Sequence, residues 1–203
     1  MLDVFARRLL DRPLNTAASS LARLGIGANA LTLSGFGLGL VAVPLLAFEA
    51  YIAALILILL NRLADGLDGP LARTTGHVSD LGGFLDIVCD FVFYSAVIFG
   101  FALGQPDYAL PAAFLIFSFV GTGSSFLAYA IVAAKRGITT DLRGRKSLYY
   151  LGGLTEGTET VAFLIVICLF PDWFPWLAWG FGIACWITTA TRVLAGWRNF
   201  RGS

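Results

Sequence analysis

The sequence predicts an all-α integral membrane protein, with six transmembrane helices and an N-terminal amphipathic helix that lies at the membrane interface. Three observations predict this class. Of the 203 residues, 58% are hydrophobic and only 13% are charged, whereas a soluble domain carries about 25% charged residues. The apolar residues form long continuous runs, and about 20 such residues cross a bilayer as one helix. These runs lack the alternation of polar and apolar residues that marks a membrane β-strand.

Six apolar runs define the predicted transmembrane helices. They cover residues 28–48, 50–73, 80–104, 108–134, 148–170 and 173–197. The connections between them are too short for a second domain, and the sequence contains no internal repeat or low-complexity tract. We therefore expect residues 1–203 to form one membrane domain, in which residues 28–197 hold the six spans.

The segment before the first run, residues 1–24, has the pattern of an amphipathic helix followed by a linker. Its apolar residues fall near one helical face and its charged residues on the other: Leu2, Phe5, Leu9 and Leu10 against Asp3, Arg7, Arg8 and Asp11. Such a helix lies among lipid headgroups and is held there partly by anionic lipids, although a short helix packed on its own protein would show the same pattern. Pro13 is expected to end the helix. We expect no cleavable signal peptide, because this segment is charged and amphipathic where a signal peptide has an apolar run.

The distribution of basic residues predicts the orientation in the membrane. The N-terminal segment, the connections after spans two and four, and the C-terminus carry Arg7, Arg8, Arg12, Arg23, Arg73, Lys135, Arg136, Arg143, Arg145, Lys146, Arg198 and Arg201. The opposite connections contain Glu49, Asp107 and Asp172 but no Lys or Arg. Because basic loops stay on the cytoplasmic side, we expect both termini and these loops to face the cytoplasm.

Two pairs of aspartates lie inside the predicted second and third spans. Asp65 and Asp68 are three residues apart, and Asp86 and Asp90 are four apart, so each pair shares one helix face. The short polar connection between the two spans makes them antiparallel neighbours, with both pairs toward their cytoplasmic ends. We therefore expect the four carboxylates to converge on one cavity.

A carboxylate inside a membrane is costly and therefore usually marks a functional site. Four such charges repel each other strongly at low dielectric, unless they are protonated, paired with basic residues or bound to divalent cations. Arg62 and Arg73 are the only basic residues nearby in the sequence, too few for pairing alone. Oxygen ligands without nearby His or Cys favour Mg²⁺ or Mn²⁺, and two such ions would balance four aspartates and suit phosphoryl transfer. Structural salt bridging is the alternative.

Eight residues of this region form a recognisable pattern. Asp65-x-x-Asp68-Gly69-x-x-Ala72-Arg73, then eight residues, then Gly82-x-x-x-Asp86-x-x-x-Asp90 resembles the signature of the CDP-alcohol phosphatidyltransferases, with every fixed position filled. The six spans and the interfacial helix also resemble that family's fold, and the closest likeness is to short, poorly characterised bacterial members. The resemblance implies an enzyme of phospholipid synthesis in the bacterial inner membrane, with its active site on the cytoplasmic side. Such an enzyme transfers a substituted phosphoryl group from a CDP-linked lipid, such as CDP-diacylglycerol, to an alcohol and releases CMP.

The resemblance also implies a role for each signature residue. Asp65, Asp68 and Asp86 would bind two divalent cations, Mg²⁺ or Mn²⁺, and Asp90 would contact one cation and act as the catalytic base that takes the alcohol's proton. That role requires a free oxygen on Asp90, or a metal that makes the alcohol more acidic. The residues that would contact the CDP-lipid are Asn29, Thr32, Gly69, Ala72, Arg73, Ser79 and Gly82. In the segment "ANALT", Ala28 stands where the family usually has a proline.

The signature does not define the alcohol acceptor. A basic loop with Lys135, Arg136, Arg143, Arg145 and Lys146 would suit a phosphorylated acceptor, but membrane topology and contact with anionic headgroups explain it as well. Glu156 and Glu159 form a second acidic pair in the fifth span. This pair would form salt bridges with Arg62 or Arg192, bind hydroxyls or an amine of the acceptor, or line a polar cavity. We favour the salt bridges.

A divalent-cation transporter or channel is the alternative from another functional class, because acidic helix pairs also bind permeating ions. A permeation path would need polar residues in the outer halves of the same spans. The third span instead runs "FVFYSAVIFGFALG" after Asp90, nearly without polar groups. We therefore expect as partners a CDP-linked lipid, a small alcohol or alcohol phosphate, and membrane lipids, and we expect no nucleic acid. The resemblance also implies a homodimer.

Overall fold

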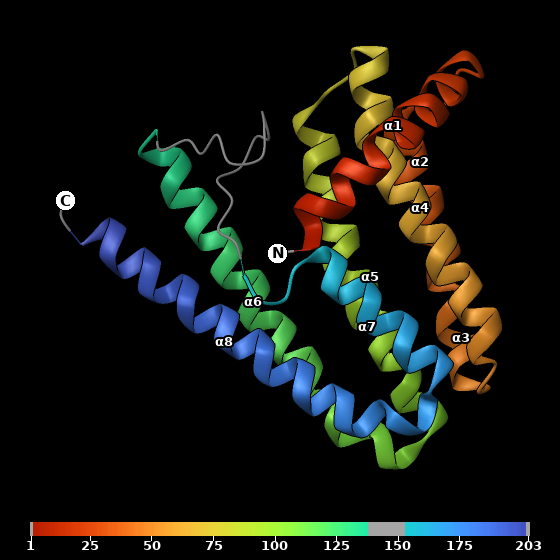
Figure 1. Ribbon diagram of the computed structural model, residues 1–203, viewed down its shortest axis with the longest axis vertical. Helices are drawn as coiled ribbons and strands as arrows, with labels where there is room; N and C mark the ends of the chain where they lie inside the picture. Colours follow the sequence, from red (N-terminus) through yellow and green to blue (C-terminus); the bar gives the residue numbers. More distant parts are fainter. Residues whose placement is uncertain (1, 138–152, 202–203) are drawn as a thin grey trace.

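The computed structural model describes residues 2–137 and 153–201, with side chains from residue 11 onward. These two ranges contain helices and short connections but no strand (Figure 1). In chain order the helices are α1 (Leu2–Arg23), α2 (Ala28–Leu40), α3 (Ala42–Ala47), α4 (Tyr51–Thr75), α5 (Asp80–Gly104), η1 (Pro106–Tyr108), α6 (Ala109–Lys135), α7 (Gly157–Leu169), η2 (Pro171–Trp173) and α8 (Phe174–Phe200).

Four stretches of the described chain are long and apolar enough to cross a membrane. They are Ala28–Ala47, Asp80–Gly104, Pro106–Lys135 and Pro171–Phe200, and they match the predicted first, third, fourth and sixth spans. Many large apolar side chains on them remain exposed, as expected where lipid rather than water covers the surface. The predicted class, an all-α membrane protein, is confirmed.

The other two predicted spans correspond to α4 and α7. Helix α4 has 25 residues and is therefore about 37 Å long at 1.5 Å per residue, but its second half carries the acidic motif. Helix α7 has 13 residues, and the first part of its predicted span, residues 148–152, lies outside the described residues. The count of six spans therefore stays a prediction.

The first predicted span is interrupted where α2 ends and α3 begins. Pro44 lies four residues after Leu40 and cannot donate a backbone hydrogen bond to the Leu40 carbonyl. The Val41 amide instead donates to the Leu38 carbonyl at 3.2 Å, which tightens the turn at this point. The sequence analysis did not anticipate this break, because the apolar run is continuous across it.

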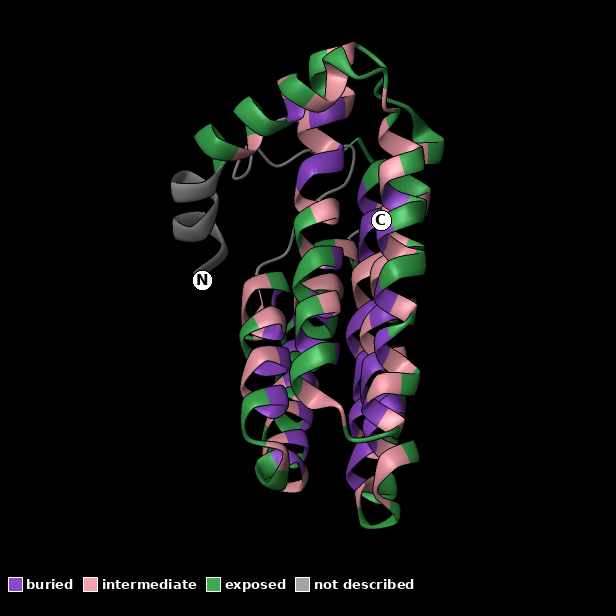
Figure 2. Ribbon diagram, turned by 90° about the vertical axis from the view of Figure 1, so that its right-hand side faces the viewer, coloured by how far each residue is buried: buried purple, intermediate pink, exposed green. Residues whose placement is uncertain are grey.

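The helices converge at the end of the bundle near η1 and η2 (Figure 1). Phe101 of α5 stacks on Phe174 of α8 with ring centroids 4.7 Å apart, and both side chains are buried. From this end the α6 and α8 pair diverges from α2 and α4 (Figure 1). Buried residues follow the inward faces of the helices (Figure 2).

Helix α1 lies across the bundle at the opposite end and contacts α4 and α7 (Figures 1 and 2). The prediction that Pro13 ends this helix is wrong, because α1 continues to Arg23 with Pro13 inside. A proline inside a helix costs about 3 kcal/mol. Packing in the second half offsets this cost, since Ala18 is fully buried and Leu14 lies against Gly66 of α4.

Candidate active site

Three carboxylates from two helices come together near the end of the bundle crossed by α1. Asp65 and Asp68 lie on α4 and Asp86 lies on α5, and one oxygen of each is within 4.8 Å of the other two. Asp68 is buried and the others are half-buried. Three oxygen donors at this separation fit a divalent cation such as Mg²⁺ or Mn²⁺.

The short connection between α4 and α5 brings these carboxylates together. Helix α4 ends at Thr75, where Gly76 adopts the left-handed conformation with φ of 72°, which glycine tolerates without strain. Helix α5 begins after Ser79, whose Oγ accepts a hydrogen bond from the Gly82 amide at 3.1 Å. The chain therefore reverses within four residues and places the two aspartate-bearing faces side by side.

Helix α2 packs closely on α4 and contacts the carboxylate group from that side. A Cβ on Gly35 would lie only 2.6 Å from Cβ of Ala64, so glycine at this position allows the helices to approach. Thr32, one turn earlier, donates a hydrogen bond from Oγ1 to Oδ2 of Asp68 at 2.5 Å. Thr32, which the family resemblance assigns to the CDP-lipid, therefore contacts a member of the carboxylate group.

Asp90 is held differently from the other three aspartates. Nη1 of Arg62 donates to Oδ1 of Asp90 at 2.7 Å and lies 3.6 Å from Oδ2 of Asp65. The group of three mutually close carboxylates found among the described residues does not include Asp90. The four predicted carboxylates are thus neighbours: Asp65, Asp68 and Asp86 form the close group, and Arg62 bridges Asp90 to Asp65.

Two small clusters contain the other residues expected to contact the CDP-lipid. A Cβ on Gly82 would lie 3.1 Å from Oδ1 of Asn29 and 3.3 Å from Oγ of Ser79. Asn29 of α2 is therefore a neighbour of Ser79 and Gly82 at the start of α5. On α4, a Cβ on Gly69 would lie 3.3 Å from Nη1 of Arg73. Ala72 is half-buried beside the exposed Arg73.

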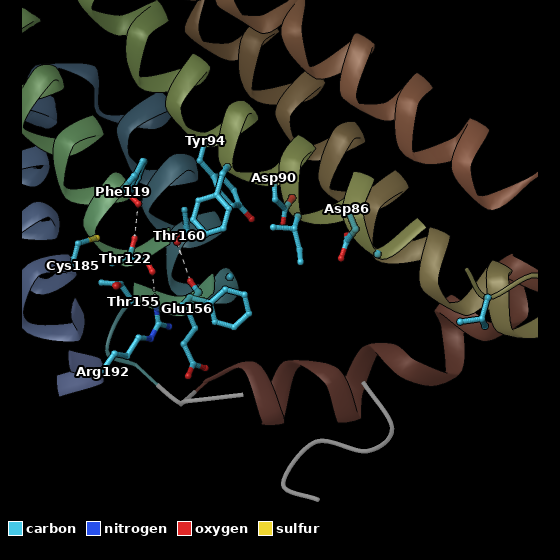
Figure 3. Close-up of a pocket in the computed structure, with 16 residues that line it drawn as sticks. Asp86, Asp90, Tyr94, Phe119, Thr122, Thr155, Glu156, Thr160, Cys185 and Arg192 are labelled. Atoms are coloured by element: carbon cyan, nitrogen blue, oxygen red, sulfur yellow. Dashed lines mark hydrogen bonds between the residues drawn. The ribbon is translucent and has the colours of Figure 1, made fainter. Parts of the chain in front are cut away.

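A cavity of about 400 Å³ extends from the aspartates into the space between α5, α6, α7 and α8 (Figure 3). Asp86 and Asp90 lie on one side of it, and Glu156 and Arg192 lie on the other (Figure 3). Its remaining lining consists of aromatic, aliphatic, hydroxyl and small residues: Val78, Gly83, Ile87, Phe91, Tyr94, Phe119, Thr122, Phe126, Thr155, Gly157, Thr160 and Cys185.

The turn that precedes α7 forms the polar side of this cavity. Oε1 of Glu156 accepts a hydrogen bond from the Gly153 amide at 2.9 Å. Thr188 of α8 fixes the same turn, because its Oγ1 accepts from the Leu154 amide at 3.1 Å and from the Thr155 amide at 3.2 Å. These contacts place the backbone of a loop, rather than a helix face, against the cavity.

The predicted acidic pair divides between two environments. Glu156 is buried and lines the cavity, whereas Glu159 lies on α7 and is not among the described residues that line it. Arg62, one of the two partners proposed for this pair, pairs with Asp90 and Asp65 instead. Arg192 is buried, and its Nη1 donates to the Thr122 carbonyl at 3.0 Å.

The basic loop is described only at its start. Arg136 donates to the carbonyls of Asn199 and Phe200 at 3.2 and 3.0 Å, and so its positive charge lies at the C-terminal end of α8, where it is favourable. Lys135 is the last residue of α6 and is exposed. Arg143, Arg145 and Lys146 lie outside the described residues.

The sequence analysis missed several polar residues of the cavity. Tyr94 lies four residues after Asp90, so helix periodicity alone would have placed it on the same face. Thr155 and Thr160 lie next to the predicted acidic pair in the sequence, whereas Thr122 carries no such signal, because it reaches the cavity from α6.

A family model described as CDP-alcohol phosphatidyltransferase matches residues 26–191. The chain therefore belongs to the CDP-alcohol phosphatidyltransferase family. This confirms the predicted enzyme class, a metal-dependent transferase of phospholipid synthesis. The inner membrane protein YnjF of Escherichia coli (strain K12) is 52% identical over 195 residues, which cover 96% of this chain and 89% of that protein. Together with the apolar helices, this likeness indicates a bacterial membrane protein.

Other similar proteins have names that state an activity. The archaetidylinositol phosphate synthase of Pyrococcus horikoshii is 41% identical over 98 residues, which cover 48% of this chain and 52% of that protein. The crystal structure of Mycobacterium tuberculosis phosphatidylinositol phosphate synthase (PgsA1) with CDP-DAG bound superposes with a TM-score of 0.67 at 21% identity, covering 92% of this chain and 94% of that one. A complex of PgsA1 with manganese and citrate gives the same TM-score. At this identity the likeness demonstrates the fold.

Proposed function

We propose that this protein transfers the substituted phosphoryl group of a CDP-linked lipid, such as CDP-diacylglycerol, to a small alcohol or alcohol phosphate and releases CMP. One observation carries the proposal: the oxygens of Asp65, Asp68 and Asp86 lie within 4.8 Å of one another beside a cavity large enough for an acceptor. The family membership supports the reaction class, and the CDP-DAG complex of PgsA1, which has this fold, supports the donor.

Asp65, Asp68 and Asp86 are the residues that would hold two divalent cations, and Asp90 would contact one of these cations, by analogy with the family. Their oxygen donors suit Mg²⁺ and Mn²⁺, and the manganese complex of PgsA1 is consistent with this assignment. When bound, the cations neutralise the donor's pyrophosphate and stabilise departing CMP. Thr32 orients Asp68 through its hydrogen bond, in the manner of a residue that supports a metal ligand.

The donor would lie along α4 and the start of α5. Gly69 leaves the backbone open beside Arg73, whose guanidinium suits a phosphate oxygen. Asn29, Ser79 and Gly82 are neighbours at the start of α5, where backbone amides favour anionic groups. In this arrangement the nucleotide occupies the polar end of the site while the lipid tails remain in the bilayer.

The transfer step uses Asp90 as the base. An acceptor hydroxyl in the cavity gives its proton to the Asp90 carboxylate, and its oxygen forms a bond to the phosphorus that carries the lipid. The bond from that phosphorus to the bridging oxygen breaks, and CMP leaves with the electron pair. Such a displacement depends mainly on charge neutralisation and in-line positioning, and Asp86 and Asp90 both line the cavity that would position the acceptor.

The acceptor would occupy the cavity between Asp90 and the turn before α7. Glu156, Thr160 and Arg192 offer it one anionic, one hydroxyl and one cationic side chain. The product named for a similar synthase, archaetidylinositol phosphate, contains an inositol group and so supports an acceptor with several hydroxyl groups. In the proposed arrangement, both termini and the site lie on the cytoplasmic side of a bacterial inner membrane, where soluble CMP can leave. The family resemblance adds the proposal that the protein forms a homodimer.

An enzyme assay tests this proposal. The purified protein is incubated with CDP-diacylglycerol, Mn²⁺ and each of a panel of alcohols and alcohol phosphates. Released CMP is measured for each acceptor, with and without EDTA. We expect CMP to appear with at least one acceptor and to disappear when EDTA removes the metal. Uptake of Mn²⁺ into proteoliposomes, without CMP release for any acceptor, would overturn the proposal in favour of a cation transporter.

A further inference from the structure

The turn before α7, residues 153–157, forms one wall of the cavity on the side opposite the aspartates (Figure 3). Thr155, Glu156 and Gly157 of this turn all line the cavity. Helix α7 begins only at Gly157, so the hydrogen bonds of the helix do not fix the residues before it. The position of this wall therefore depends on contacts from another element.

Thr188 of α8 supplies these contacts. Its Oγ1 accepts hydrogen bonds from the Leu154 amide at 3.1 Å and from the Thr155 amide at 3.2 Å, and the Thr155 hydroxyl donates to the same oxygen at 3.1 Å. The Thr188 hydroxyl itself donates to the Ala184 carbonyl of its own helix at 3.0 Å, which leaves its lone pairs for the turn. Thr188 is fully buried, so bulk solvent does not compete for these bonds.

Gly153 packs directly against Thr188. A Cβ on Gly153 would clash with Cγ2 of Thr188 and would lie 3.3 Å from Nη2 of Arg192. Thr188 and Arg192 are four residues apart and therefore share one face of α8. The Gly153 amide donates to Oε1 of Glu156 at 2.9 Å. Glycine at this position thus lets the turn lie against α8, while its amide holds the Glu156 side chain.

We propose that Thr188 and Gly153 are positioning residues that together fix this turn as the wall of the cavity that recognises the acceptor. The inference rests on the proposed function, in which the acceptor occupies the cavity. Neither residue belongs to the described lining, so both act through Thr155 and Glu156. The simpler role is structural, because buried amides need a hydrogen-bond partner whatever the cavity holds. A structural role predicts lower stability with unchanged acceptor binding, whereas positioning predicts a selective loss of acceptor binding.

Substitutions on α8 separate the two roles. CMP release is measured with CDP-diacylglycerol, Mn²⁺ and glycerol, glycerol phosphate, inositol or inositol phosphate as the acceptor. We expect Thr188→Val, which removes the hydroxyl but keeps the shape, to raise the acceptor KM about tenfold or more. The KM for CDP-diacylglycerol should change by less than about twofold. A wild-type acceptor KM in Thr188→Val would overturn the inference, even if the thermal midpoint of the variant falls.

Two control variants accompany this substitution. Thr188→Ser keeps the hydroxyl and should stay close to the wild type. Thr189→Val is the matched control, because the Thr189 side chain is also buried but its hydroxyl donates within α8, to the Cys185 carbonyl at 2.9 Å. It should leave both KM values unchanged. An acceptor KM that rises equally in Thr188→Val and Thr189→Val would overturn the inference, because the effect would then not depend on the turn.

A compensating pair tests the contact between Gly153 and Thr188. Gly153→Ala should raise the acceptor KM about tenfold, because the new methyl group pushes the turn away from Thr188. Adding Thr188→Ser removes the methyl group that the new Cβ meets and keeps Oγ1, so we expect the double variant to regain most of the lost acceptor affinity. The same acceptor KM in Gly153→Ala and in the double variant would overturn the inference.

Alkylation of Cys185 gives a readout that does not depend on turnover. Cys185 lines the cavity with Thr155 (Figure 3) and is 1% exposed, and Cys168 near the far end of α7, also 1% exposed, is an internal control. We expect N-ethylmaleimide to modify Cys185 about fivefold faster in Thr188→Val than in the wild type, with Cys168 unchanged, because displacement of the turn opens the cavity. Unchanged alkylation would overturn the inference. A wild type that releases no CMP with any acceptor, while this alkylation pattern holds, would count against the proposed function and support the anchoring of the turn.

Discussion

At the scale of single residues, the aspartates differ in the partners that hold them. Asp68 accepts a hydrogen bond from Thr32, and Asp90 accepts one from Arg62. Asp65 and Asp86 complete the group of three mutually close oxygens. The i, i+3 and i, i+4 spacings predicted which aspartates share a face, but they carry no information about these partners. The partners depend on how α2, α4 and α5 are rotated relative to one another.

Thr32 offers a test of the support given to Asp68. Thr32→Val removes the hydroxyl that donates to Asp68 while keeping the shape of the side chain, and Thr32→Ser keeps the hydroxyl. We expect Thr32→Val to weaken Mn²⁺ activation of CMP release by about tenfold, since loss of a residue that orients a metal ligand typically has this effect. Thr32→Ser should stay close to the wild type. An unchanged Mn²⁺ requirement with a higher KM for the CDP-lipid would show that Thr32 contacts the nucleotide instead.

The acidic pair before and within α7 offers a second test at this scale. Glu156 lines the cavity, whereas Glu159 does not belong to the described lining. We therefore expect Glu156→Gln to raise the acceptor KM by about tenfold while donor affinity is unchanged, because it removes a charge from the acceptor's surroundings. Glu159→Gln should shift the thermal midpoint of unfolding and leave the acceptor KM close to the wild-type value. If the two variants alter acceptor use equally, the cavity does not hold the acceptor as proposed.

At the scale of helices, the apolar runs predicted the elements well, because a segment that crosses a bilayer must satisfy all its backbone hydrogen bonds within itself. The effect of Pro13 was misjudged and the break before Pro44 was not anticipated, because the effect of a proline depends on packing. Pro13 lies inside α1, where contacts with α4 maintain the helix, whereas the break between α2 and α3 lies one turn before Pro44. A local pattern does not reveal which contacts compensate a proline.

Two glycines on α4 give a matched test of the face that receives the donor. A Cβ on Gly69 would lie 3.3 Å from the Arg73 guanidinium, whereas a Cβ on Gly66 would make only an ordinary 3.8 Å contact with Leu14. We expect Gly69→Ala to raise the KM for the CDP-lipid about threefold or more because Arg73 must move, and Gly66→Ala to leave it unchanged. Equal effects of the two substitutions on this KM would place the donor elsewhere.

At the scale of the whole molecule, the bundle is packed at one end and carries its cavity toward the other. The stacked rings of Phe101 and Phe174 mark the packed end, and the α6 and α8 pair diverges from α2 and α4 toward α1 (Figure 1). The predicted membrane class and family are confirmed. The sequence predicted a cavity at the aspartates but not its full lining, which comes from four helices and two connections that are distant along the chain. The single-domain organisation and the cytoplasmic orientation stay predictions.

The central claim is that Asp65, Asp68 and Asp86 bind the metal on which CMP release depends. The most direct measurement is a Mn²⁺ titration of CMP release from CDP-diacylglycerol by the wild type and by Asp86→Asn, with folding of the variant checked by its thermal midpoint in detergent. We predict saturable activation of the wild type and a loss of about 100-fold or more in the variant at every Mn²⁺ concentration. Near-normal turnover of a folded Asp86→Asn, or wild-type turnover that persists in EDTA, would contradict the account.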